Sequence, residues 1–545
     1  MSLHVKRWWY LVHRWLGIPL CIVMALWFLS GMVMLYVGYP KLTDAERQQG
    51  LAPLVAEGCC VPLAQALQAA GLGAAPDAPT APASAASAPA KRHGHGRGGP
   101  LGWRLAAVAG EPHYLFTDGR AVAIAVDARS GRRVERVDEA RALASARHFA
   151  QGLPAHHLGV RQEDAWTHSR ALDAHRPLHL VALDGDPADR WLYVSSRTGE
   201  VVRDASFTER SWGWIGAWLH WLYLFRGNAF DGWWTDIVIW LSIAGTVAAL
   251  TGLVVGLMRW RWRGRYRSGR KTPYPGLAAR WHHWLGLAGG VLCLTWVFSG
   301  LMSMNPWKVF EAPGPKPDRV AYAGGPLQPA LAPEAASVLA RLAAAGHSVR
   351  ELEWQRVGGV HQVVAQGPGG PWVMDAQGVQ AEEVPAERWQ AAAARLLPNA
   401  RITSSVRLDR YDAYYVAREP HTMGGHRERP LPVWRLRFDD ANATEVTIDP
   451  RTGAILQISD THRRADRWLF AFLHSFDLPV LLASRPAWDL GMLGFSLAGL
   501  GLSLTAVVTG WRRLRRKAGW PATSPREAFH RPVPGARDAT TQGSS

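Results

Sequence analysis

The sequence predicts a membrane protein of four transmembrane α-helices, built as a parallel internal duplication with two large extracytoplasmic α+β domains. Three observations lead to this prediction: four long apolar runs without charge, lysine and arginine gathered on one side of those runs, and a match between the two halves of the 545-residue chain.

Each apolar run holds about 21 residues, which is long enough to cross a ~30 Å hydrocarbon core at 1.5 Å per residue. The runs are Leu16–Val37, Ile237–Met258, Trp284–Met304 and Leu490–Trp511. Many of the 28 tryptophans lie at their ends, where interfacial anchors are expected. The first run is too long for a signal-peptide core and no small-residue cleavage pattern follows it, so we interpret it as an uncleaved anchor.

The net charge of +17 is concentrated in three short segments on the same side of the four runs. By the positive-inside rule, both chain termini and the central loop are cytoplasmic in a bacterial inner membrane. This placement explains the charge through topology and attraction to anionic lipid, and we expect no nucleic-acid partner. The cationic residues are Lys6, Arg7, Arg259, Arg261, Arg263, Arg265, Arg267, Arg270, Lys271, Arg512, Arg513, Arg515, Arg516 and Lys517.

These signals divide the chain into membrane helices, large extracytoplasmic segments and basic cytoplasmic segments. The predicted units are 1–37 (cytoplasmic N-terminus and first helix), 38–211 (first extracytoplasmic domain), 212–258 (interfacial histidine helix and second helix), 259–280 (basic loop), 281–304 (third helix), 305–467 (second extracytoplasmic domain), 468–511 (interfacial histidine helix and fourth helix) and 512–545 (basic tail). We expect the Ala/Pro/Gly-rich stretch 74–100 to be a disordered loop.

The two halves match at two constant offsets. His13-Arg-Trp-Leu-Gly17 aligns with His282-His-Trp-Leu-Gly286, and Trp27, Ser30 and Gly31 align with Trp296, Ser299 and Gly300. At the second offset His220, Trp234, Thr251 and Gly256 align with His474, Trp488, Thr505 and Gly510. Both halves enter the membrane in the same direction, so the expected symmetry axis lies along the membrane normal.

The two extracytoplasmic segments also share a pattern of helices and hairpins. Each has an alanine-rich helical stretch, at Asp138–Ala150 and Ala332–Ala345. Polar turn residues closed by glycine predict hairpins, because glycine supplies the positive φ that such turns need. These turns end at Gly131, Gly199, Gly378 and Gly453.

Four histidines occupy the ends of the membrane runs in aromatic, apolar surroundings. His13 and His282 begin runs one and three, whereas His220 and His474 precede runs two and four. Ionisable residues in such settings are costly and usually functional. Under the expected two-fold axis His13 faces His282 and His220 faces His474. Each pair is then placed to bind one haem, because imidazole is a common axial ligand and helix bundles hold cofactors between facing helices.

Two alternatives remain open for these histidines. They can be interfacial residues bonded to lipid headgroups or backbone carbonyls, and His283, which aligns with Arg14, is a rival to His282 as ligand. Two b-type haems with paired imidazoles would leave the iron no open position, which suits electron transfer. No Cys-x-x-Cys-His occurs, so covalent haem attachment is not expected.

Other polar clusters give weaker signals. His93 and His95 lie in a Gly/Pro loop and are expected to be solvated, and His156, His157, His175 and His179 lack ligand spacing. The four cysteines offer no disulfide framework, since Cys21 and Cys293 lie in membrane runs and Cys59 and Cys60 are adjacent. No nucleotide-binding loop or hydrolase motif is present. The region Tyr411–Arg418 through His421, His426 and Arg429 to Pro432 is rich in aromatic and cationic groups, and is either a receptor for an anionic substrate or a solvated face.

These residues resemble the PepSY-associated transmembrane family of bacterial inner-membrane proteins over nearly the whole chain, except 74–100 and the tail after about 518. The resemblance rests on the His13–Gly17 opening and its repeat, the Asp449–Gly453 hairpin, Tyr411–Tyr415 with Arg429–Pro432, and Leu473–Ser475 leading to Trp488, Asp489 and Thr505. It implies two PepSY-like periplasmic domains and a two-haem reductase acting on ferric siderophores, with His13, His220, His282 and His474 at the haem-ligand positions.

The predicted function is therefore a di-haem b oxidoreductase that reduces a periplasmic ferric siderophore or other ferric chelate in iron uptake. The chain lacks the flavodoxin- or reductase-like cytoplasmic domain fused to some relatives, so the expected donor is quinol or a separate protein. Two alternatives are a non-catalytic protein whose PepSY domains bind or regulate a periplasmic partner, and a transporter. No peptidase apparatus is present to support the peptidase label that the family name suggests.

Overall fold

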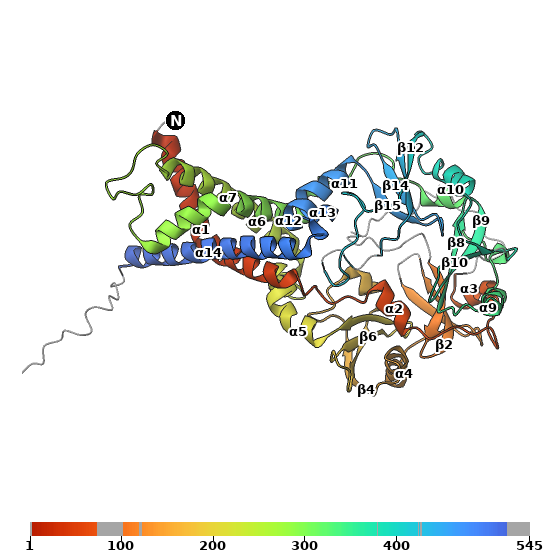
Figure 1. The fold of residues 1–545 in the computed structure, drawn as a ribbon. Coiled ribbons are helices and arrows are strands. Elements are labelled where there is room, and N and C mark those ends of the chain that lie inside the picture. The colour runs from red at the N-terminus through yellow and green to blue at the C-terminus, as the bar shows by residue number, and fades with distance from the viewer. Residues whose placement is uncertain are drawn as a thin grey trace, which may run out of the picture.

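Four long helices form a bundle at one end of the molecule and three β-sheets lie at the other (Figure 1). The computed structural model describes residues 3–72, 102–118, 122–378, 380–422, 425 and 428–519. All four bundle helices are long and apolar enough to cross a membrane. They are α1 (Leu3–Met34), α6 (Trp234–Arg259), α7 (Leu277–Ser303) and α14 (Arg485–Lys517).

In the bundle α1 packs against α6 and α14, and α7 packs against the same two helices. Small residues let the backbones approach. A Cβ on Gly499 would lie 2.3 Å from Cε1 of Phe28, and one on Gly245 would lie 2.9 Å from Cγ1 of Val297. Close packing over small residues is how membrane helices associate without a hydrophobic driving force between them.

Among the described residues fifteen strands form the three sheets, and every neighbouring pair is antiparallel. The seven-stranded sheet has the order β11 (Gln380–Ala381), β10 (Trp372–Asp375), β9 (Val360–Gln366), β8 (Glu351–Val357), β1 (Trp103–Val108), β2 (Glu111–Thr117), β3 (Ala123–Asp127). The four-stranded sheets are β4 (Ala155–Arg161), β5 (Leu178–Leu183), β6 (Trp191–Ser195), β7 (Val201–Ala205), and β12 (Ile402–Leu408), β13 (Val433–Phe438), β14 (Glu445–Ile448), β15 (Ile455–Ser459).

The seven-stranded sheet contains strands from both halves of the chain. β1 pairs with β8 in a register that sets Trp103 opposite Trp354. One apolar core, including Trp103, Tyr114 and Leu352, lies against this sheet and takes residues from both halves. The segments 38–211 and 305–467, which the sequence suggests as two domains, are therefore joined by shared backbone hydrogen bonds and a shared core.

Shorter helices pack against the sheets or beside the bundle, and the predicted alanine-rich helices are among those on the sheets. Asp138 caps α4 (Glu139–Phe149) by accepting a hydrogen bond from the Arg141 amide, and the second stretch forms α9 (Ala335–Ala344). The predicted turn glycines 131, 199, 378 and 453 all have positive φ, which confirms the hairpin turns. The other helices are α2 (Asp44–Gly50), α3 (Leu63–Ala69), α5 (Phe207–Gly213), α8 (Arg319–Ala323), α10 (Ala386–Ala393), α11 (Thr461–Asp466), α12 (Leu473–Ser475) and α13 (Pro479–Leu482).

A buried network of charged groups reinforces the junction between the halves. Glu351 at the start of β8 forms ion pairs with Arg47 at 2.7 Å and with Arg104 at 2.8 Å. Arg104 also forms an ion pair with Glu200 at 2.9 Å. Burial alone would raise the pKa of Glu351, but the two arginines hold it at about 2. The carboxylate of Glu351 is therefore charged and fully compensated.

We expect Glu351→Gln to lower the free energy of unfolding by about 3 kcal/mol, because the buried Glu351 carboxylate is the shared counter-charge of two partly buried guanidinium groups. The measurement is the midpoint of thermal unfolding of the detergent-purified chain, followed by circular dichroism. Glu57→Gln, at an exposed carboxylate of the first half, is the control. Equal midpoints for the two variants would show that the network does not stabilise the junction.

Candidate functional site

The four membrane-edge histidines lie in two pairs. The ring centroids of His13 and His282 are 6.2 Å apart, with 29° between the ring planes. Those of His220 and His474 are 6.0 Å apart, with 70° between the planes. We call His13 and His282 the loop-side pair, since they lie in the first halves of α1 and α7, toward the end that carries the basic loop. His474 lies in α12, at the end of the bundle nearer the sheets (Figure 1), and together with His220 it forms the sheet-side pair.

In the loop-side pair each imidazole is held through Nδ1 by a helix backbone. Nδ1 of His13 lies 3.0 Å from the Ala248 carbonyl of α6, and Nδ1 of His282 lies 3.2 Å from the Leu502 carbonyl of α14. A carbonyl oxygen only accepts hydrogen bonds, so Nδ1 carries the proton in both rings and Nε2 keeps its lone pair. Thr505 adds a hydroxyl 3.4 Å from His282 Nδ1.

In the sheet-side pair two serines hold the imidazoles in matching ways. Ser30 Oγ lies 3.0 Å from His220 Nδ1, and Ser299 Oγ lies 3.0 Å from His474 Nδ1. Each hydroxyl donates its own hydrogen to a carbonyl of its helix, that of Trp27 or Trp296. The serine oxygens therefore accept from Nδ1–H, and Nε2 again keeps its lone pair.

Within the described part of the chain, no hydrogen bond reaches Nε2 of any of the four histidines. Fixing one ring nitrogen through a protein acceptor, while the other stays free, is the usual arrangement around a metal-bound histidine. All four rings share it. The pairs are therefore chemically suited to bind a metal ion between two imidazoles.

Irregular backbone positions the sheet-side pair. A π-helical turn, η2 (Trp214–Trp218), precedes His220, and a second, η7 (Arg467–Phe472), precedes His474. Two residues after each histidine the chain reverses at a non-glycine residue with positive φ, Leu222 at 53° and Phe476 at 46°. π-Turns and left-handed non-glycine residues are strained features that concentrate at functional sites.

A glycine makes room for the loop-side pair. A Cβ added to Gly252 of α6 would lie 2.5 Å from Cε1 of His13, so only glycine fits beside this ring. At the sheet side the corresponding contact is looser, because a Cβ on Gly31 would lie 3.8 Å from Cε1 of His220. The His13 ring is therefore packed directly against the α6 backbone.

His283 has a different role from its neighbour His282. Its Nδ1 lies 2.8 Å from the Thr272 hydroxyl and its Nε2 lies 2.9 Å from the Gly256 carbonyl. The ring is buried and packs edge-on against Trp260 and Tyr274. With both nitrogens engaged by protein oxygens, His283 fixes the loop that follows α6, and His282 is the histidine that faces His13.

The other candidate residues form no comparable site. His157 lies 3.1 Å from His179 and 3.3 Å from Glu139, and His156 pairs with Asp184 at 2.9 Å. No group of three or more His, Cys, Asp or Glu side chains among the described residues is arranged to hold a metal ion. His93, His95 and His426 lie outside the described residues.

Cys59 and Cys60 are joined to each other by a disulfide, while Cys21 and Cys293 are free and buried. The sequence argument looked for spaced cysteines that link separate segments, and an adjacent pair gives no such signal. This disulfide does not connect distant parts of the fold.

The aromatic and cationic region around Tyr411 directs its polar groups toward one another. Arg435 binds Asp412 through two hydrogen bonds of 2.6 and 3.1 Å, which lower the pKa of Asp412 although burial would raise it. Arg429 stacks over the Tyr415 ring at 5.1 Å and donates to Gln457. These internal contacts favour a structural role over an open receptor for an anionic substrate.

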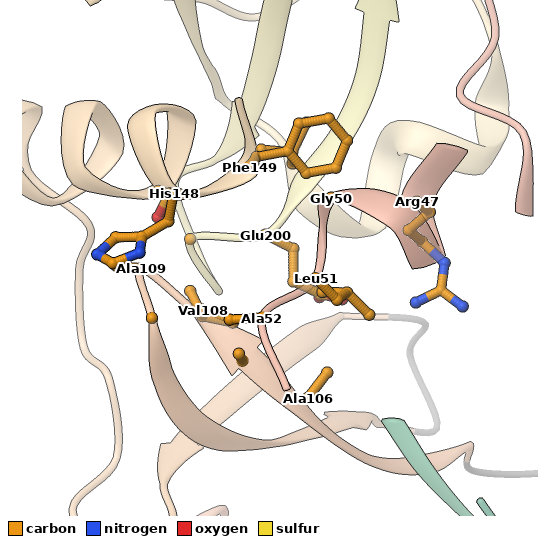
Figure 2. A pocket seen from close by; sticks show the side chains of 15 residues that line it. Arg47, Gly50, Leu51, Ala52, Ala106, Val108, Ala109, His148, Phe149 and Glu200 are labelled. Atoms are coloured by element: carbon orange, nitrogen blue, oxygen red, sulfur yellow. The ribbon is translucent and has the colours of Figure 1, made fainter. Parts of the chain in front are cut away.

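Neither of two surface hollows coincides with the histidine pairs. Figure 2 shows the first, of about 30 Å³, which lies between α2, α4 and β1 and is lined by residues such as Arg47, Leu51, His148 and Phe149. A space of that size holds little more than a water molecule. The second is an open apolar groove along the start of α6, lined by Phe225, Trp233, Asp236, Ile237, Trp240 and Leu241.

A comparison with protein-family models matches residues 10–397 to the PepSY-associated TM region. The matched residues make up more than half of the chain and include His13, His220 and His282, whereas His474 and the motifs between Tyr411 and Thr505 lie beyond them. A comparison with curated proteins found no match.

Proposed function

We propose that this chain, which belongs to the PepSY-associated transmembrane family, is a di-haem b oxidoreductase. It passes electrons across the bacterial inner membrane to a periplasmic ferric chelate such as a ferric siderophore. The observation that supports this proposal is that the four imidazoles form two pairs, one near each end of the helix bundle.

The residues present fit haem in both geometry and protonation. Two imidazoles that bind one metal at about 2.0–2.1 Å per nitrogen have ring centroids about 6 Å apart. The two separations in the structure are 6.2 and 6.0 Å. The ring tautomers inferred above leave Nε2 as the ligand atom at all four positions.

Each residue of the site has a definable task in this reaction. His13 and His282 would hold one haem and His220 and His474 the other, and a haem bound this way supplies one-electron transfer without an open coordination position. The Ala248 and Leu502 carbonyls and the Ser30 and Ser299 hydroxyls keep the imidazoles oriented. One electron reduces one ferric ion, so a quinol, which gives two electrons and two protons, would serve two ferric chelates.

The orientation rests on the distribution of charge. The basic loop between α6 and α7, the start of α1 and the end of α14 lie at the end of the bundle away from the sheets (Figure 1). The positive-inside rule assigns that end to the cytoplasm, which gives cytoplasmic termini and periplasmic sheets. The donor is then quinol or a separate electron-donor protein, and the bundle surface contacts lipid.

The contacts of the two sheet-side histidines support an origin by internal duplication. Ser30 holds His220 as Ser299 holds His474, at equal distances, and the turns after both histidines reverse at the same relative position. Two PepSY-like domains, one per half, would follow from this origin even though one sheet now joins them.

The purified chain should contain two b-type haems per polypeptide with low-spin spectra, because all four imidazole Nε2 atoms are free to bind iron. The measurement is a pyridine haemochrome assay on protein from haem-supplied cells, with protein determined by amino-acid analysis. A haem content near zero would instead favour a non-catalytic protein that binds or regulates a periplasmic partner.

Gly252→Ala should remove or convert the loop-side haem component and leave the sheet-side component unchanged, since the new Cβ would meet the His13 ring at 2.5 Å. Alanine is the better helix former, so this loss does not report melting of α6. Gly289→Ala in α7, where the Cβ meets nothing within 4 Å, is the control. Redox-difference spectra compare the variants, and a normal spectrum for Gly252→Ala would contradict the assignment of His13.

A further inference from the structure

One segment between β12 and β13, residues 409–422, contacts both chain segments that carry the sheet-side histidines. On the His474 side the contacts are made by the Ala413 carbonyl, the Tyr414 hydroxyl and the Arg418 guanidinium. Toward His220 it offers His421, which faces α5. We call this segment the clasp.

The contact on the His474 side is a buried charge cluster. Arg418 lies 2.6 Å from Asp477 and also bonds the hydroxyl of Ser475, the residue after His474. Arg467, in the π-turn before His474, binds the other oxygen of Asp477 at 2.7 Å and the Ala413 carbonyl at 2.7 Å. The clasp thus fixes His474 from both sides along the chain.

The contact on the His220 side is an ion pair across the two halves. His421 Nε2 lies 2.8 Å from Glu46 of α2, and its Nδ1 lies 3.5 Å from Glu209 of α5, the helix that runs into the π-turn before His220. The ion pair with Glu209 and the hydrogen bond with Glu46 raise the pKa of His421 to about 10, so the ring is charged at neutral pH.

The surroundings of His421 explain why a cation is needed there. Asp204, at the end of β7, is buried, and one of its carboxylate oxygens has no hydrogen-bond partner in the described structure. Burial, with repulsion from Glu46 and Glu209, raises the pKa of Asp204 to about 7, and Arg190 counteracts this only in part. The His421 charge offsets this acidic group. The backbone of His421 also packs tightly against the residues that follow α1, since a Cβ on Gly38 would lie 2.2 Å from the His421 carbonyl oxygen.

We infer that Arg418 and His421 are positioning residues that hold the His220 and His474 segments together and set the spacing of the sheet-side imidazoles. The inference rests on the proposed function, because the positioned rings are the proposed haem ligands. Neither residue touches the rings themselves. Their effect passes through Ser475 and Asp477 on one side and through α5 on the other.

The test compares Arg418→Gln and His421→Gln with the charge-retaining variants Arg418→Lys and His421→Lys, in the full haem-loaded chain. The glutamine variants should shift the midpoint potential of the component that His220→Ala removes and give it a high-spin fraction, while leaving the other component unchanged. The lysine variants should restore most of the wild-type midpoint potential and most of the low-spin spectrum. Arg407→Gln, at an exposed residue paired with Asp409, is the control.

Hydrogen exchange on the same variants needs no haem and separates failure of this inference from failure of the proposed function. Arg418→Gln should speed exchange in 467–477 and His421→Gln in 205–221, each by about tenfold, because a charged hydrogen bond is lost. In haem-containing protein, unchanged spectra for both glutamine variants overturn the inference. If the wild-type chain holds no haem, the proposed function fails, and exchange unchanged in both segments overturns the clasp as well.

Discussion

His13→Ala and His282→Ala should remove or convert the same haem component, and the double variant should lose little more than either single variant. The two imidazoles face one another at 6.2 Å and would act on one iron, so removing the second ligand after the first adds little. His220→Ala and His474→Ala should affect the other component in the same non-additive way. Redox-difference spectra of the purified variants, with haemochrome quantification, provide the measurement.

Controls come from two histidines outside these pairs. His283→Ala should have a smaller effect, because its ring nitrogens bind Thr272 and Gly256 and its loss acts only on the loop. His156→Ala, at an exposed ion pair, should have none. If His13→Ala and His220→Ala removed one component and His282→Ala the other, each half would hold its own cofactor and the pairing between halves would be wrong.

Much of the bundle could be predicted from the sequence because membrane crossing requires long, uncharged segments. The structural helices are longer than the apolar runs. α1 begins at Leu3, well before Leu16, and α14 continues to Lys517. These ends carry charged residues that a hydropathy pattern assigns to loops, although a helix can continue through the headgroup region while its cationic side chains reach the aqueous phase.

The partners of the histidines were only partly visible in the sequence. Ser30 and Ser299 stood out as matching positions, but their contacts join residues far apart in the chain, and periodicity says nothing about such contacts. Ala248 and Leu502 act through backbone carbonyls, so no side-chain pattern marks them. The π-turns before His220 and His474 likewise depend on tertiary packing.

The junction between the halves was not predictable either. Alternating apolar residues identify a strand but not its neighbour, and β1 pairs with β8 across more than two hundred residues. The charges that reinforce this pairing, Arg47, Arg104 and Glu351, are scattered through segments that read as ordinary solvated sequence. The contacts of the clasp are equally non-local, which is why the region around Tyr411 suggested a receptor for substrate.

Transmembrane electron transfer should require both pairs. The stretch of α1 from His13 to Ser30, which contacts His220, is about 25 Å long at 1.5 Å per residue, so the two pairs lie near opposite faces of the hydrocarbon core. Proteoliposomes that enclose a ferric chelate and a ferrous indicator, with dithionite outside, should form ferrous ion inside at a rate set by the protein.

His13→Ala and His220→Ala should each lower that rate to the level of protein-free liposomes, because the remaining pair serves only one face. His156→Ala, reconstituted at the same protein-to-lipid ratio, should keep the wild-type rate. A wild-type rate in His13→Ala would mean that electrons enter at the sheet-side pair alone, and the loop-side pair would then have no part in crossing the membrane. No rate in haem-containing wild-type protein would exclude a transmembrane reductase and leave the bound haem with another role.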